Sequence, residues 1–250
     1  MAKAKKVRIA AVQLNISKPI DSVINDIRKF MHLASTKKVN IICFPEDSIS
    51  LGPKKNRLIL SQVMEGCKLY GIWCIISTYL KEKKYNYNSA LLIDDKGNIF
   101  GKHKKVHVLG DGPGISPGSK FDVHKTPFCK IGIAICWDVS NPAAIKRMAR
   151  KGAKIIFCPM YWCYDEWAHK KNHKKFEKKI LQSLILTRAY ESLVYVVFCN
   201  PVDEEENRLT SYTAIAEPHK IIKGLFNKEG MILADIDLKY LAAMRRKWST

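Results

Sequence analysis

Short apolar segments rich in β-branched residues recur along the chain, and segments with helical spacing of apolar residues separate some of them. Such segments predict strands, and those with few polar residues predict strands buried on both faces. The expected strands are 7–14, 39–44, 73–80, 89–94, 130–135, 154–158, 194–200, 213–216 and 231–236. The expected helices are 22–36, 57–70, 142–151, 166–191 and 238–247. This order of elements predicts an α/β fold of stacked layers.

The chain shows no internal repeat, low-complexity linker or shift in composition that would divide it. The segment 110–118 holds four glycines and two prolines in nine residues, which predicts a loop. With 250 residues, of which 47% are hydrophobic, the chain is long enough to bury one sizeable core. The sequence therefore predicts a single domain over residues 1–250.

Several features favour a cytoplasmic protein. Arg8 and Gln13 interrupt the first apolar stretch and no small-residue cleavage site follows it, so no secretory signal is expected. No apolar run approaches the roughly 20 residues that a membrane-spanning helix needs. The eight cysteines are scattered without a CxxC pair, which is typical of a reducing compartment rather than of a disulfide framework.

Basic residues outnumber acidic ones, with 43 Lys and Arg against 23 Asp and Glu and a formal net charge of +20. Such an excess could favour an acidic small substrate, bind nucleic acid weakly, or belong only to a dispersed solvated surface. The basic residues occur throughout the chain, and neither an arginine-rich tail nor a recognised nucleic-acid motif accompanies them. We therefore expect a dispersed surface charge and no nucleic-acid partner.

Cys136 is a candidate nucleophile. It follows the apolar segment 131–135 and precedes Pro142, whose fixed φ suits a first helical turn. A nucleophile at a bend between strand and helix projects from the sheet, and the next backbone N–H, that of Trp137, can point at a developing oxyanion. A thiol with a pKa of about 8.5 needs a base or a cationic neighbour to react at neutral pH. Taken alone, Cys136 favours the structural interpretation, that of a small buried hydrophobic residue.

Glu46 and a lysine are candidate partners for this thiol. Glu46 follows the apolar segment 41–45, and functional groups of α/β proteins gather at strand ends. Burial there would raise its pKa towards neutrality, as suits a group that accepts and returns a proton; the alternative is a surface carboxylate. A lysine beside the thiol would favour the thiolate and stabilise an oxyanion. Composition does not choose among three neighbouring lysines, Lys102, Lys104 and Lys105.

A metal-dependent hydrolase is the competing enzyme class. His169 and His173 lie four residues apart on the expected helix 166–191, with Cys163 nearby, a spacing compatible with zinc ligands. The segment lacks the glutamate of an HExxH motif, and the lysines around both histidines indicate a solvated helix face. We therefore expect no metal and no other cofactor.

Four aromatic residues follow the expected strand 154–158: Tyr161, Trp162, Tyr164 and Trp167. They could form a wall of a substrate pocket. Aromatic residues pack in cores and subunit interfaces at least as often. Only Trp162 is taken as a candidate substrate contact.

Together these segments resemble the nitrilase superfamily of carbon-nitrogen hydrolases, whose signature is a Glu, a Lys and a Cys in that chain order. The resemblance covers nearly the whole chain, from 8–13 through 44–46, and its most specific match is 132–138 around the cysteine. The family's lysine segment aligns on 103–107, which selects Lys105. Further matches follow in order at 151–156, 188–191, Asn200, Ser211 and 217–218.

The resemblance implies a four-layer α-β-β-α sandwich that pairs through its helices into a homodimer or larger homo-oligomer. It also implies hydrolysis of a non-peptide carbon-nitrogen bond through a thioester on Cys136, with Glu46 as the base and Lys105 at the oxyanion. A small carboxamide that releases ammonia is the first expectation, an N-carbamoyl amino compound the second and a nitrile the third. The net positive charge mildly favours a substrate that bears a carboxylate.

The sequence departs from the family pattern at two places. Ala143 replaces the glutamate usually found after the proline that follows the nucleophile segment. A second family glutamate, which helps to position the lysine and the substrate, is missing near the lysine loop, and Asp111 is its candidate replacement. A catalytically inactive relative that serves as a basic binding scaffold is therefore the non-enzymatic alternative.

Overall fold

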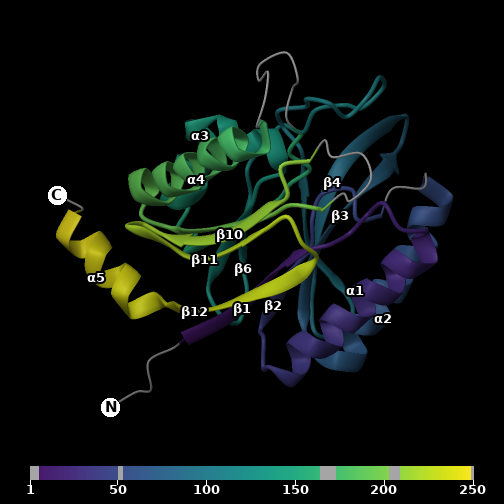
Figure 1. The fold of residues 1–250 in the computed structure, drawn as a ribbon, viewed down its shortest axis with the longest axis horizontal. Helices are drawn as coiled ribbons and strands as arrows, with labels where there is room; N and C mark the ends of the chain where they lie inside the picture. Colours follow the sequence, from purple (N-terminus) through teal and green to yellow (C-terminus); the bar gives the residue numbers. More distant parts are fainter. Residues whose placement is uncertain (1–5, 50–52, 164–172, 203–208, 249–250) are drawn as a thin grey trace.

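Two mixed β-sheets pack face to face, and helices cover the outer face of each (Figure 1). The computed structural model describes residues 6–49, 53–163, 173–202 and 209–248. The order of layers is helix, sheet, sheet, helix, which confirms the predicted four-layer α-β-β-α sandwich. No described helix is both long enough and apolar enough to cross a lipid bilayer.

The first sheet has the strand order β12-β1-β2-β3-β4-β5. Its strands are Gly230–Asp237 (β12), Lys6–Gln13 (β1), Ile41–Cys43 (β2), Trp73–Glu82 (β3), Tyr85–Ile93 (β4) and Ile99–Lys104 (β5). The central strands β1, β2 and β3 are parallel, and the outer pairs are antiparallel. Helices α1 (Ile20–Thr36) and α2 (Pro53–Tyr70) cover the outer face of this sheet.

The second sheet repeats this pattern with the order β11-β10-β9-β8-β7-β6. Its strands are Lys220–Phe226 (β11), Tyr212–Glu217 (β10), Tyr195–Cys199 (β9), Ile155–Pro159 (β8), Lys130–Ile133 (β7) and Val123–Lys125 (β6). Here β7, β8 and β9 are the parallel strands. Helices α3 (Pro142–Arg150) and α4 (His173–Ser192) cover this sheet, and α5 (Leu238–Trp248) follows β12.

Strand β1 shows why the central segments are almost wholly apolar. Val7, Ile9 and Ala11 belong to the core that contains the facing side chains of both sheets. Ala10 and Val12 point the other way, into the core under α1 and α2. Because successive strand residues face opposite sides and both sides are buried, nearly every position must be apolar.

The expected strands and helices are present with shifted ends, but three strands were missed. β5, β6 and β11 are edge strands, and their sequences mix lysine or histidine with apolar residues. β7 ends two residues before the expected 135, and Pro142 opens α3 as expected. Residues 166–172 of the expected helix 166–191 lie outside the described residues.

Candidate functional site

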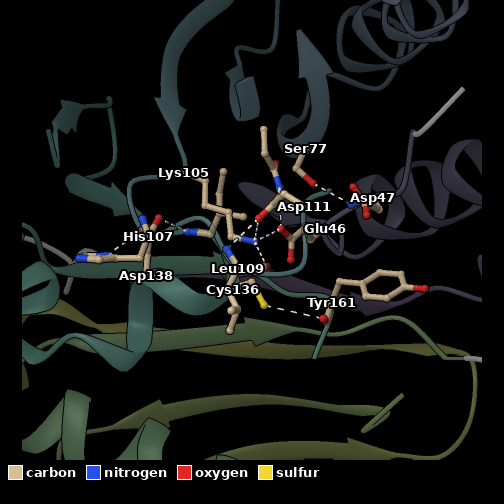
Figure 2. Close-up of polar contacts among 12 residues, drawn as sticks. Glu46, Asp47, Ser77, Lys105, His107, Leu109, Asp111, Cys136, Asp138 and Tyr161 are labelled. Carbon is tan, nitrogen blue, oxygen red and sulfur yellow. Dashed lines mark hydrogen bonds and ion pairs between the residues drawn. The ribbon is translucent and has the colours of Figure 1, made fainter. Parts of the chain in front are cut away.

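The site forms where the carboxyl ends of parallel strands from the two sheets meet. Glu46 follows β2 of the first sheet, and Cys136 follows β7 of the second. The backbone N–H of Glu46 donates over 3.1 Å to the carbonyl of Met160, which directly follows β8. The Cys136 thiol lies 3.8 Å from the carbonyl oxygen of the next residue, Tyr161 (Figure 2). These contacts bring Glu46 and Cys136 to one place.

Cys136 lies at a sharp bend of the backbone. β7 ends at Ile133, and a short 3-10 helix, Cys136–Ser140, begins at the cysteine itself. Its φ of 43° is in the left-handed region, which side chains other than glycine's rarely adopt. Such strain persists where the surrounding structure fixes it and is common at functional residues. The bend turns the thiol away from the sheet, as expected for a nucleophile between strand and helix.

Lys105 lies buried directly after β5, between two carboxylates. Its Nζ is 2.9 Å from Glu46 Oε1 and 2.7 Å from Asp111 Oδ2. It also lies 3.4 Å from the carbonyl oxygen of Leu109 (Figure 2). The ammonium therefore carries its charge inside the protein with two opposite charges beside it.

The two other candidate lysines lie outside this group. Lys104 Nζ pairs with Glu82 at 2.7 Å and lies over the ring of Tyr87. Lys102 pairs with the same Glu82 carboxylate. The structure thus places Lys105, the residue that the family resemblance selected, beside Glu46.

Asp111 reaches the site from the irregular segment 110–118. Besides Lys105, its carboxylate accepts hydrogen bonds from Asn88 Nδ2 at 2.5 Å and from the backbone N–H of Leu109 at 3.1 Å. Asn88 Nδ2 also donates to Glu46 Oε1 at 2.6 Å. Asp111 and Asn88 therefore hold the lysine and the glutamate in one hydrogen-bonded network.

The buried carboxylate of Asp138 joins the segment that contains Lys105 to the turn that contains Cys136. It accepts hydrogen bonds from the backbone N–H groups of Ile135 (3.0 Å), Val106 (3.0 Å) and His107 (2.7 Å). His103 Nε2 lies 2.9 Å from it. Burial alone would raise the pKa of Asp138, but these hydrogen bonds hold it below the ordinary value.

The protonation of Cys136 is dominated by burial. Burial raises the pKa of its thiol well above the ordinary value, and the Glu46 carboxylate raises it further. Lys105 lowers this pKa, as expected, but cannot offset burial because two carboxylates share its charge. Burial also raises the pKa of Glu46, against the charge of Lys105. Burial therefore favours the neutral thiol of Cys136, which would need a base in order to react.

These residues line a cavity of about 260 Å³. Its lining comprises Glu46, Asp47, Tyr79, Lys105, Leu109, Gly110, Asp111, Cys136, Trp137, Tyr161, Trp162 and Cys163. The rings of Trp137 and Trp162 lie 5.4 Å apart, and Trp162 Nε1 donates to Glu177 on α4 at 3.0 Å. Every residue that the sequence analysis proposed as catalytic or substrate-binding thus lines this cavity. Tyr164 and Trp167 lie outside the described residues.

Some residues of the site were not predicted, and some sequence candidates lie elsewhere. Asn88, Tyr79 and Asp47 were missed, although Asn88 is a polar residue at the start of an apolar strand segment. Ala143 is exposed in the first turn of α3, away from the cavity lining.

The zinc alternative finds no support in the described part of the chain. His169 lies outside the described residues, as does the side chain of His173. Among the described residues no group of three or more His, Cys, Asp or Glu is arranged to hold a metal ion.

The carbon-nitrogen hydrolase family model matches residues 8–246 of the chain. Omega-amidase NIT2 of Xenopus tropicalis is 26% identical over 97% of this chain and 92% of its own length. N-carbamoylputrescine amidase of Arabidopsis thaliana is 28% identical over 78% of this chain and 70% of its own. The fold resembles that of a carbon-nitrogen hydrolase from Helicobacter pylori, with a TM-score of 0.85, 19% identity, and 98% and 94% of the two chains covered. The predicted family is thus confirmed, and the chain belongs to the carbon-nitrogen hydrolases.

Proposed function

We propose that the chain is an amidase that hydrolyses a small carboxamide and releases ammonia, with Cys136 as nucleophile. One observation carries this proposal: Glu46, Lys105 and Cys136 line one cavity, and Lys105 Nζ lies 2.9 Å from Glu46 Oε1. A thiol, a base and an ammonium are the groups that cysteine-based acyl transfer requires. The two relatives named above are both amidases, which supports the same reaction class here.

In the first half-reaction, Glu46 accepts the thiol proton and the Cys136 sulfur attacks the amide carbon. The oxyanion that forms is stabilised by the Lys105 ammonium and the backbone N–H of Trp137. The carbon-nitrogen bond then breaks as Glu46 returns the proton to the leaving nitrogen. Ammonia leaves, and the acyl group remains on sulfur as a thioester.

In the second half-reaction, Glu46 deprotonates a water molecule, and the resulting hydroxide attacks the thioester carbon. The carbon-sulfur bond breaks, the acid product leaves and the thiol regains its proton. The raised pKa of Glu46 suits a carboxylate that accepts and returns a proton in both halves. Side chains and water supply every proton and electron pair, so the scheme uses no metal or organic cofactor.

Ammonia release tests this function. The substrates are small carboxamides, ω-amides of dicarboxylates, N-carbamoyl amino compounds and nitriles, and the Cys136→Ala protein is the control. We expect release from carboxamides by the parent protein alone, with a mass increase on Cys136 during turnover. Equal release by the Cys136→Ala protein would rule out this mechanism.

Two alternatives give different results in the same experiment. An N-carbamoyl compound releases carbon dioxide with the ammonia, and the Arabidopsis relative favours this as the second candidate. An inactive binding scaffold would release no ammonia, would leave Cys136 unlabelled and would bind a nucleic acid or protein partner in a salt-sensitive way.

We also propose that the protein assembles into a homodimer or larger homo-oligomer through α4. Phe176 and Ile180 lie one turn apart on this outer helix and are about half exposed, at 50% and 45%. Leu184, partly buried, continues the same stripe. An exposed apolar stripe of this kind is typical of a protein interface. Ile180→Glu should reduce the mass measured by light scattering, and an unchanged mass would exclude this surface.

We further propose that residues 1–250 act as one domain in the cytoplasm. β12, near the carboxyl end, pairs with β1, and Arg245 on α5 donates to the carbonyls of Leu193 and Ala153 in the other half. The eight cysteines all lie in the described part of the chain and form no disulfide, which fits a reducing compartment. A single unfolding transition and recovery of the protein in the cytosolic fraction are the expected results.

A further inference from the structure

The local charge of the cavity is opposite in sign to the charge of the chain. Glu46, Asp47 and Asp111 all line it, whereas Lys105 is the only cation among its described lining residues. Both Glu46 and Asp111 already lie within hydrogen-bonding distance of Lys105. A substrate carboxylate would therefore meet two competing carboxylates at this lysine. Positive surface charges farther away than a Debye length of about 8–10 Å are screened by salt, so they do not offset the repulsion of a substrate carboxylate by these two residues.

Asp47 is the lining carboxylate that has no step in the proposed mechanism and, unlike Asp111, no ion pair with Lys105 among the described contacts. Its backbone N–H donates to Ser77 Oγ at 3.2 Å, and its φ of 58° turns the chain directly after Glu46 (Figure 2). Its Oδ1 is buried and accepts no hydrogen bond within the described part of the chain. Buried carboxylate oxygens are normally paired, because leaving one without a partner is costly. Asp47 thus presents one unsatisfied acceptor oxygen, Oδ1, beside the cavity, while Tyr79 hydrogen-bonds to the same carboxylate.

Aromatic rings surround the same space. Tyr79, Trp137, Tyr161 and Trp162 line the cavity with these carboxylates. The Tyr79 hydroxyl lies 3.4 Å from Asp111 Oδ1, which ties this ring to the acidic network. A carboxylate together with aromatic faces attracts an ammonium group through both charge and cation–π contact. Neither feature attracts an anion.

We propose that the substrate carries an ammonium group, which Asp47 binds while the amide carbon lies at Cys136. This inference rests on the proposed amidase function and narrows its substrate class to short ω-ammonium amides or carbamoyl compounds. The small cavity, of about 260 Å³, fits a substrate of a few carbons. The carboxylate-bearing substrate that the overall charge favoured is therefore disfavoured.

A second cavity, which shares Asp47 and Tyr161 with the first, contains another cation, Lys18. Lys18 Nζ pairs with Asp26 at 2.7 Å and with Glu229 at 2.6 Å. It is therefore matched by two carboxylates, as Lys105 is. Among the described lining residues, the one cation of each cavity is thus already paired with two carboxylates. An anionic group would find no unpaired cation there.

Three amides of similar length test this inference: δ-aminovaleramide, hexanamide and the monoamide of adipic acid. Ammonia release is measured above pH 7, the approximate pKa of Asp47. We expect kcat/KM for the cationic amide to exceed that of hexanamide by about tenfold or more, and the anionic amide to fall below hexanamide. A preference for the anionic amide, or equal values for all three, would overturn the inference while leaving the amidase function intact. No release from any of the three would count against both.

The role of Asp47 is tested by the ratio of kcat/KM for the cationic and neutral amides. Asp47→Asn should reduce this ratio at least about threefold, and the matched variant Asp95→Asn, in an exposed turn, should leave it unchanged. An unchanged ratio in the Asp47→Asn protein would refute the role of this residue.

Inhibition of the parent protein provides a test that needs no variant. Butylammonium should compete with hexanamide, whereas butyrate should not, and the reverse order would contradict the proposal.

Discussion

The backbone N–H of His107 donates to Asp138 Oδ1 at 2.7 Å, across 31 residues of sequence. The same carboxylate accepts the N–H of Ile135, the residue before Cys136, the proposed nucleophile. Asp138 does not line the cavity, yet it fixes the Lys105 segment relative to Cys136. Catalysis by positioned groups loses rate when their geometry shifts by even about 1 Å. We infer that Asp138 is a positioning residue.

Asp138→Asn should therefore lower kcat more than it changes KM. The amide replaces one acceptor oxygen with a donor, so a buried N–H group loses its acceptor and the fold loses about 1–3 kcal/mol of stability. Steady-state kinetics and urea unfolding measure the two effects. Asp95→Asn is the control for charge alone, and an unchanged kcat in the Asp138→Asn protein would exclude the positioning role.

Lys105→Ala should abolish turnover, whereas Lys104→Ala should retain it. Removal of the Lys105 ammonium leaves Glu46 and Asp111 as buried carboxylates without their cation, which costs about 3–5 kcal/mol of stability. Lys104 pairs with Glu82 outside the cavity and serves as the matched control. Ammonia release and thermal unfolding of both variants check this prediction, and an active Lys105→Ala protein would contradict it.

Asp111→Asn should reduce kcat by about ten- to a hundredfold, because a hydrogen bond to a charged group contributes about 1.5–3 kcal/mol. The variant keeps the side-chain size but loses the charge that lies 2.7 Å from Lys105 Nζ. Asp111→Glu restores the charge and the residue type of the wider family, so it should recover part of the activity. Equal loss in both variants would show that shape rather than charge matters at this position.

Asp47 predicts a pH dependence of stability. Burial, with the charges of Glu46 and Asp111, raises its pKa from 3.8 to about 7 in the folded protein. The protonated form is thus favoured by folding, so its contribution is complete below pH 3.8 and is lost as the pH rises through about 7.

Over this interval the parent protein should lose up to about 1.4 kcal/mol per pH unit relative to the Asp47→Asn protein, in which this group cannot ionise. Urea unfolding of both proteins from pH 4 to about 8 measures the difference. A constant difference across this range would mean that Asp47 does not titrate there.

Local sequence predicted the central part of the fold and placed two of the three proposed catalytic residues, Glu46 and Cys136, at strand ends. The two apolar segments that end at Glu46 and at Cys136 predict strands buried on both faces. Such strands are typical of short segments rich in β-branched residues. Pro142 predicted the start of α3 from its fixed φ alone. The edge strands β5 and β11 were missed because their exposed faces carry lysines, which hide the apolar pattern.

The tertiary structure decided what depends on distant contacts. Three nearby lysines look alike in composition, and although the family resemblance selects Lys105, its burial between Glu46 and Asp111 is a property of the fold. Asp111 and Asn88 meet Glu46 although they lie in separate segments of the chain. The sequence named the proposed catalytic residues through strand ends and the family resemblance, which are both properties of local segments. The charges of the cavity residues could not be predicted without the fold. Burial and neighbouring charges set their pKa values, and both depend on residues that are far apart in sequence.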